Sequence, residues 1–183
     1  MKSRETLRKE FEAGAFPYLD SLYQMSFCLT RNESKAAELV QQSYRKSFDR
    51  WKQTSELADY RKLLLGALAE IFLSDLPDDE RIEIAATDYH GNHNSPGEES
   101  FSLKAVPCSI LGKAIAHVPA DIRLMIILSI HWRLSYDEIA ETMGIGLDNV
   151  RTKMRAGRQR LRALLIDDFM AMDKQDNPAM ASN

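Results

Sequence analysis

The chain has 183 residues, 44% of them hydrophobic and 28% charged, which is typical of one globular domain or two small ones. It contains no apolar run of about 20 residues that could span a bilayer, and its mixed-charge beginning does not resemble a secretory signal. The two cysteines, Cys28 and Cys108, lie far apart and fit a reducing compartment. We therefore expect a cytoplasmic protein, and the small numbers of glycines and prolines favour helices over a many-turned β-sandwich.

A net charge of −3 conceals a local concentration of basic residues. The segment Val150–Arg162 contains six of them and no acid. They are Arg151, Lys153, Arg155, Arg158, Arg160 and Arg162. A basic helix within an acidic protein is a typical site for binding the phosphates of a nucleic acid.

Residues 1–79 are predicted to form a small helical bundle, because apolar residues recur there every three or four positions. Pro17 is expected to start a helix with an inner face of Leu19, Leu22, Met25 and Leu29. A second helix carries a stripe, expected in the core, of Leu39, Val40, Tyr44, Phe48 and Trp51. A third helix starts near Tyr60 and is stopped by Pro77.

Residues 80–107 are polar and rich in turn formers, so we expect a linker there. Asp88, His90 and His93 lie close together in it, but a structural metal site usually has about four ligands on a defined scaffold. The chain shows no Ser/His/Asp order, no glycine-rich phosphate loop and no pair of inward carboxylates. We therefore expect no metal, no other cofactor and no enzymatic activity.

Residues 108–168 are predicted to form a second helical domain, followed by a polar tail over 169–183. A helix is expected to begin at Pro119. The sharpest signal is a capping box, in which Ser135 and Glu138 satisfy each other's backbone N–H groups at the start of a short helix. Gly144 is the expected end of this helix, because glycine adopts a left-handed conformation without strain.

The helix that follows is predicted over 150–166, with Asp148 or Asn149 as its N-terminal cap. A short helix, a tight turn and a basic second helix together form a helix-turn-helix motif. The second helix of such a motif lies in the major groove of DNA. We therefore predict that this segment binds DNA.

Two segments resemble extracytoplasmic-function (ECF) sigma factors of the sigma-70 type. Leu39-Val40-Gln41, followed by the aromatic stripe, is similar to their region 2 helix. Leu134–Gly144 and the later Val150-Arg151-Thr152-Lys153 are similar to their region 4, and His117–Arg123 is similar to the segment that begins that domain. The resemblance covers roughly residues 16–165, and region 4 is its most specific part.

The resemblance implies an all-α fold of two small helical domains, a region 2-like bundle and a region 4-like helix-turn-helix, joined by a linker. It also implies a subunit of bacterial RNA polymerase that directs promoter-specific transcription initiation. The first domain would dock on the core polymerase and melt the −10 element, and the second would recognise the −35 element. An anti-sigma factor is a further expected partner, because the chain has no sensory domain.

The resemblance further implies which residues make these contacts. The −35 element and its phosphates would be contacted by Asn149, Arg151, Thr152, Lys153, Arg155, Arg158 and Arg162. Docking on polymerase would involve Glu38, Leu39, Gln41 and Gln42. The −10 element would be contacted by Arg61 and Lys62.

Both regions also depart from the family pattern. Lys35-Ala36-Ala37-Glu38 keeps only one of three typical acids. Positions that carry mostly basic residues in the family are occupied here by Gly66, Ala69, Glu70, Pro77 and Asp78. Carboxylates there would repel the phosphates of a melted strand. In region 4, Gly157 is expected to make the recognition helix less rigid, because a helical glycine costs roughly 1 kcal/mol relative to alanine.

Three functions fit these residues. The chain is a sigma factor with a divergent region 2, a sigma-like module that sequesters an anti-sigma factor or polymerase without melting DNA, or an unrelated helix-turn-helix regulator. The basic recognition helix argues against a pure decoy, which has no use for it. The Leu-Val-Gln helix and the two-domain layout argue against an unrelated regulator.

Overall fold

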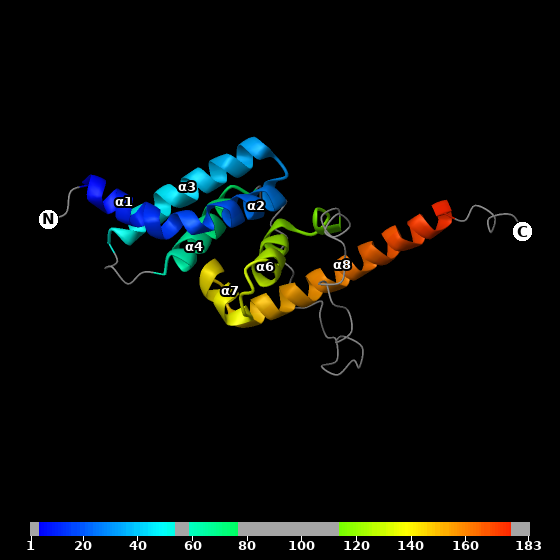
Figure 1. Ribbon diagram of the computed structural model, residues 1–183. Coiled ribbons are helices and arrows are strands. Elements are labelled where there is room, and N and C mark those ends of the chain that lie inside the picture. The colour runs from blue at the N-terminus through cyan, green and yellow to red at the C-terminus, as the bar shows by residue number, and fades with distance from the viewer. Residues whose placement is uncertain (1–3, 54–58, 77–113, 177–183) are drawn as a thin grey trace, which may run out of the picture.

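Helices account for every regular element that the computed structural model describes, in residues 4–53, 59–76 and 114–176 (Figure 1). The predicted all-α class is therefore confirmed. The helices form two units that lie against each other, with the last helix extending away from both (Figure 1). The predicted linker and its two histidines lie outside the described residues.

The first unit contains the three predicted helices and one further helix before them, which the sequence analysis did not predict. Its elements are α1 (Arg4–Ala15), the 3-10 helix η1 (Phe16–Tyr18), α2 (Leu19–Thr30), α3 (Glu33–Trp51) and α4 (Tyr60–Ser74). Side-chain caps start two of these helices. The Asn32 side chain accepts a hydrogen bond from the Lys35 N–H (2.9 Å), and the Asp59 carboxylate accepts one from the Arg61 N–H (2.9 Å).

The start of α2 differs from the prediction. Pro17 lies within η1, and α2 begins at Leu19. Leu22, Met25 and Leu29 are buried as predicted, but Leu19 is 36% exposed and does not belong to the inner face. Leu19 lies about 90° around α2 from the mean direction of Leu22, Met25 and Leu29, so it falls at the edge of the buried face.

The predicted aromatic stripe of α3 does lie in the core, where it surrounds Phe11 of α1. The Phe11 ring centroid is 5.3 Å from that of Phe48, 5.8 Å from Trp51 and 6.3 Å from Tyr44. The ring of Tyr60 joins the group from α4, 5.8 Å from Phe11. Pairs at these separations stabilise a core beyond the burial of their area, so α1 is a structural part of the bundle.

The second unit contains α6 (Ala120–Ile130), α7 (Tyr136–Met143) and α8 (Leu147–Asp176). Helix α8 begins earlier than predicted, so Asp148 and Asn149 lie in its first turn and do not cap it. It also ends later than predicted, beyond residue 166 and within the segment expected to be a polar tail.

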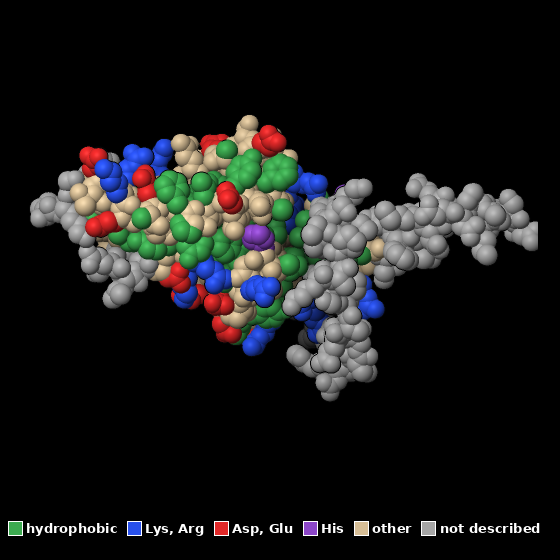
Figure 2. Space-filling view, in the orientation of Figure 1, with side chains coloured by type: hydrophobic (Ala, Val, Ile, Leu, Met, Phe, Trp, Pro, Cys, Tyr) green, Lys and Arg blue, Asp and Glu red, His purple; other side chains and the backbone are tan. Residues whose placement is uncertain are grey.

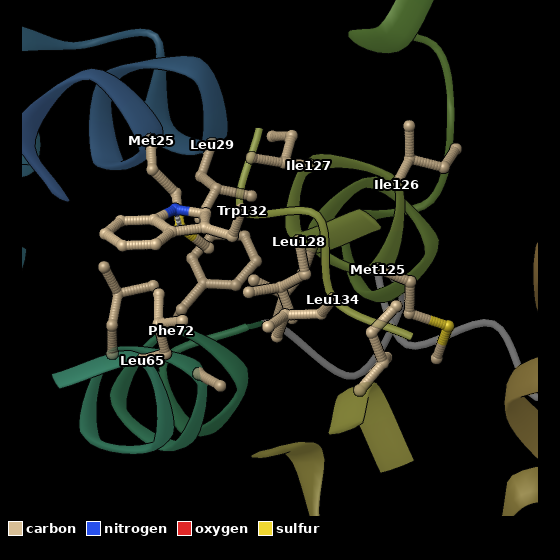
Figure 3. Packing of buried hydrophobic residues seen from close by; sticks show 14 of the residues in the cluster. Met25, Leu29, Leu65, Phe72, Met125, Ile126, Ile127, Leu128, Trp132 and Leu134 are labelled. Atoms are coloured by element: carbon tan, nitrogen blue, oxygen red, sulfur yellow. Dashed lines mark hydrogen bonds between the residues drawn. The ribbon is translucent and has the colours of Figure 1, made fainter. Parts of the chain in front are cut away.

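The two units share one hydrophobic cluster. Trp132, which follows α6, lies between Met25 and Leu29 of α2 and Leu65 and Phe72 of α4 (Figure 3). Its indole Nε1–H points to the Met25 sulfur at 3.1 Å, and the residue is only 8% exposed. The second unit is thus joined to the first by the Trp132 side chain, which packs between α2 and α4.

Candidate nucleic-acid interface

Short-range hydrogen bonds position the two helices of the helix-turn-helix. The Ser135 hydroxyl accepts a bond from the Glu138 N–H (3.2 Å), and the Glu138 carboxylate accepts one from the Ser135 N–H (2.8 Å). These bonds complete the predicted capping box and lower the pKa of Glu138. Gly144 has φ +66°, the left-handed conformation expected at the end of α7.

Four arginines lie along one flank of α8, about 90° around the helix from its buried side. The buried residues are Val150, Met154, Gly157, Leu161 and Leu165. The arginines, hereafter the arginine stripe, are Arg151, Arg155, Arg158 and Arg162. Three are exposed and Arg155 is half-buried. Their spacing places them along one side of the helix, which is the arrangement needed to follow a DNA groove.

Two members of the stripe are oriented by neighbouring side chains. The Arg151 guanidinium donates a hydrogen bond to Asp148 (3.3 Å), and both side chains are exposed. The Arg158 guanidinium lies over the Tyr136 ring, 5.7 Å from its centroid. Surface contacts of this kind are weak, so these arginines remain available to phosphates or base edges.

The other predicted −35 residues have different surroundings. Asn149 is exposed and Thr152 is half-buried at the start of α8. Lys153 points to the inside of the unit, where its Nζ lies 2.5 Å from a carboxylate oxygen of Asp121. The two side chains are only 18% and 11% exposed. The charge of Lys153 is thus paired with Asp121 of α6, and the predicted phosphate contact would require this ion pair to open.

Gly157 has a packing function that the sequence analysis did not predict. A Cβ atom at this position would lie 2.3 Å from Cγ2 of Ile122 and 3.3 Å from Cδ1 of Ile126. The absence of a side chain thus lets α8 approach α6 closely. The glycine therefore has a packing role in addition to its effect on helix propensity.

The predicted polymerase-docking residues lie on α3. Glu38 and Gln41 are exposed, and Gln42 is half-buried and donates a hydrogen bond to Glu38 (3.1 Å). Leu39 is 7% exposed and belongs to the core, so most of its surface is unavailable for docking. Leu39, Glu38 and Gln42 line one side of a cavity of ≈ 430 Å³, and Arg123 of the second unit lines the other.

The predicted −10 residues, Arg61 and Lys62, lie in the first turn of α4 and contact the second unit. The Arg61 guanidinium donates a hydrogen bond to the backbone oxygen of Trp132. The Lys62 ammonium lies 3.1 Å from a carboxylate oxygen of Glu141, and this hydrogen bond raises the pKa of Lys62. Acidic and basic side chains gather on the surface where the first unit meets α7 (Figure 2).

Glu70 was expected to repel phosphate, and the structure shows it paired with two cations instead. Its carboxylate contacts Lys46 (2.6 Å) and Arg50, both on α3. Hydrogen bonds from Lys46 and then Arg50 lower the pKa of Glu70, so it stays ionised at neutral pH. These two cations and Arg45 form a basic face of α3, which the sequence analysis did not select. The adjacent Arg45-Lys46 pair was its signal in the sequence.

We predict that Glu70→Gln strengthens binding of the chain to a single-stranded oligonucleotide, because the Lys46 ammonium loses its carboxylate partner and can bind phosphate. The association constant should be higher than that of the wild type. It should also decrease more steeply as salt is added, because the slope of log affinity against log salt becomes more negative by up to about 0.7 per additional phosphate contact. Fluorescence anisotropy over a range of salt concentrations measures both.

The same effect is expected in acid, since the ion pairs lose strength as the pH falls below 4.5 through the lowered pKa of Glu70.

Glu33→Gln is the matched control for this experiment. Glu33 is an exposed acid in the first turn of the same helix α3 and is far along the chain from Lys46 and Arg50. The Glu33→Gln substitution removes the same charge as Glu70→Gln without releasing a cation. Equal gains in the two variants would show that net charge alone is responsible and that the pairing at Glu70 does not mask the basic face.

Neither a metal site nor a membrane-spanning helix occurs within residues 4–53, 59–76 and 114–176. Among those residues, no group of three or more His, Cys, Asp and Glu is arranged to hold a metal ion. Nor does any helix in that part of the chain combine the length and apolarity required to cross a membrane.

Comparison with known proteins gives one curated relative and one solved structure. No family model matches the chain. The ECF RNA polymerase sigma factor SigE of Mycolicibacterium smegmatis is 28% identical to it over 154 residues, which are 81% of this chain and 58% of that protein. The chain thus spans less than two thirds of the length of this curated relative.

A solved structure agrees in fold. The sigma factor RpoE of Bartonella quintana, determined in complex with the anti-sigma factor NepR, matches with a TM-score of 0.62 and 21% sequence identity. The match covers 86% of this chain and 97% of that one, so both helical units are included in the likeness. The resemblance to ECF RNA polymerase sigma factors that the region 2 and region 4 motifs indicated is therefore confirmed, in sequence by one protein and in fold by the other.

Proposed function

We propose that the protein is a sigma factor of the ECF type, which joins bacterial core RNA polymerase and directs initiation at specific promoters. The observation that carries the proposal is the arginine stripe, held on the outer face of α8 by a complete helix-turn-helix. Its partners would be the core polymerase, promoter DNA and an anti-sigma factor. It would act in the cytoplasm as a regulator, with no cofactor and no catalytic activity of its own.

In this function the second unit recognises the −35 element. The N-terminal part of α8 would enter the major groove, with Asn149 and Arg151 near base edges. Arg155, Arg158 and Arg162 would follow along the phosphates. An arginine that binds a guanine edge through two hydrogen bonds contributes about 1–3 kcal/mol of discrimination against other bases.

The test is transcription by the full chain with purified core polymerase from promoter fragments of the source genome. We expect a specific start site whose use falls by about 10- to 100-fold in Arg151→Ala/Arg155→Ala, because a base-edge contact of Arg151 and a phosphate contact of Arg155 disappear. Arg160→Ala is the matched control. Arg160 is exposed on α8 but lies off the arginine stripe, so its removal should have a small effect.

A second candidate function is supported by the engagement of Arg61 and Lys62 with the second unit. A sigma-like module that sequesters its partners would bind core polymerase, or an anti-sigma factor, without opening a promoter. Core binding without transcription would favour this function. No binding to core polymerase would leave a helix-turn-helix regulator and would contradict the sigma-factor proposal.

A further inference from the structure

Two residues other than glycine have a left-handed backbone in the part of the chain that the structure describes. They are Arg31, with φ +52°, and Arg133, with φ +53°. This conformation strains a side chain, because the Cβ atom comes close to the following carbonyl oxygen. Glycine avoids the strain, and asparagine, aspartate and histidine adopt the conformation more often than arginine does. Residues held in strained conformations cluster at functional sites, so the two arginines are candidates for a function.

The turn between α6 and α7 needs the left-handed backbone of Arg133 but not its side chain. A hydrogen bond from the Leu134 N–H to the Leu128 carbonyl oxygen (3.2 Å) closes the turn. Trp132 and Leu134, on either side of Arg133, are each 8% exposed and point into the core (Figure 3). Arg133 itself is exposed, and no described residue forms an ion pair or hydrogen bond with its side chain. The turn therefore directs an uncompensated guanidinium to solvent.

This guanidinium lies at the end of the helix-turn-helix that the arginine stripe also reaches. Tyr136 follows Arg133 by three residues, so their Cα atoms are at most about 11 Å apart. The Tyr136 ring in turn lies against the Arg158 guanidinium, 5.7 Å from ring centroid to Cζ. Phosphates follow one another about every 3.4 Å along one strand of DNA. A strand that passes Arg158 thus has its next few phosphates close to the start of α7.

The chemistry at the start of α7 fits a phosphate. The capping box uses the N–H groups of Ser135 and Glu138 internally, so these two donors are not available to an anion. Arg133 supplies the positive charge instead, and a guanidinium binds a phosphate through two parallel N–H donors. In a helix-turn-helix the first helix crosses the DNA backbone while the second lies in the major groove. The residues just before α7 therefore face the backbone and not the base edges.

From this geometry we infer that Arg133 is a phosphate-binding residue, which fixes the position of α7 on the DNA backbone while the arginine stripe enters the groove. The inference rests on the DNA-binding part of the proposed function. A left-handed arginine lowers the stability of the turn, and the phosphate contact gives this residue its function. Replacement of Arg133 by glycine should therefore have opposite effects on folding and on DNA affinity.

Arg133→Gly in the full-length chain is the test. The ratio of folded to unfolded chain, from urea denaturation, should rise by about threefold, because the strain relieved exceeds the entropy that glycine adds to the unfolded chain. Affinity for a mixed-sequence duplex of about 30 base pairs should fall by about fivefold at about 0.1 M salt. The slope of log affinity against log salt should become less steep by about 0.9, as expected for one phosphate contact. Fluorescence anisotropy of the labelled duplex measures both.

Arg31→Gly is the matched control. Arg31 has the same left-handed backbone and is exposed, but it ends α2 and lies on neither helix of the helix-turn-helix. Its replacement removes the same backbone strain and the same charge, so the salt slope of duplex binding should stay that of the wild type. Arg133→Lys is the conservative variant. It keeps a cation on the strained backbone, so it should keep most of the salt slope and gain no stability.

The outcomes separate the phosphate contact from the proposed function. If Arg133→Gly binds the duplex as tightly as the wild type, the inference is overturned, while the arginine stripe is tested independently by Arg158→Ala. Equal losses in Arg133→Gly and Arg31→Gly would also overturn it, since net charge alone would then be responsible. A wild-type chain that binds no duplex would contradict both the inference and the proposed function. The expected pattern without any transcription by core polymerase would contradict the sigma-factor function and support the phosphate contact, which needs only the helix-turn-helix.

Discussion

Gly157→Ala should destabilise the protein although alanine is the better helix former. The new Cβ would lie 2.3 Å from Cγ2 of Ile122, which is 2% exposed and is held in the core between helices. Overpacking of this kind costs about 1–3 kcal/mol, whereas the gain in helix propensity is roughly 1 kcal/mol. We expect a net loss of about 1 kcal/mol in the free energy of unfolding, measured by urea denaturation, and weaker DNA binding because α8 is displaced.

Gly66→Ala is the natural comparison. Gly66 also lies inside a helix, α4, but a Cβ there would meet nothing within 4 Å. The same substitution should therefore raise the free energy of unfolding, by up to about 1 kcal/mol. Destabilisation of the two variants by equal amounts would show that contact with Ile122 is not the cause. A double variant with Ile122→Ala should show favourable coupling, because the alanine at 157 then fills part of the space vacated.

Removal of one partner of the Asp121–Lys153 pair is expected to have the second large effect. The charges lie 2.5 Å apart with most of both side chains buried. Asp121→Ala would leave the lysine charge uncompensated inside the unit, at a cost of about 3 kcal/mol. The double variant Asp121→Asn/Lys153→Met should be more stable than Asp121→Ala, since it removes both charges. Urea denaturation of the three chains measures this.

Lys153 and Arg158 should then differ in their effect on DNA affinity. Arg158→Ala, in the arginine stripe, should reduce the slope of log affinity against log salt by about 1, the loss expected for one phosphate contact. Lys153→Met should leave that slope unchanged at temperatures where the variant is folded. A decrease of equal size would mean that Lys153 leaves Asp121 on binding DNA and contacts phosphate after all.

The elements that were predictable depend on neighbours in the chain. The capping box joins Ser135 and Glu138 within one turn, and Gly144 ends the same helix by its own backbone conformation. The apolar spacing of α3 and α4 similarly predicted both the helices and their buried faces. Such patterns involve residues three or four positions apart, so they can be recognised in the sequence without knowledge of the tertiary structure.

The sequence did not reveal the ion pairs of side chains whose partners are distant in sequence. Lys153 was indistinguishable from the other cations of its segment until Asp121, on another helix, was placed beside it. Glu70 was expected to repel phosphate because its two cationic partners lie a helix away on α3. In each case a charge that the sequence presents as available is already used within the fold.

By itself, the sequence determined the helical class, the helix-turn-helix and the basic character of its second helix, because composition, periodicity and caps act locally. The tertiary structure decided which of those cations face outward, why Gly157 is needed against Ile122, and how the two units are joined at Trp132. These properties depend on the distance between helices and on burial. Both arise only when segments far apart in the chain pack together, and no periodicity in one segment encodes the partner it will meet.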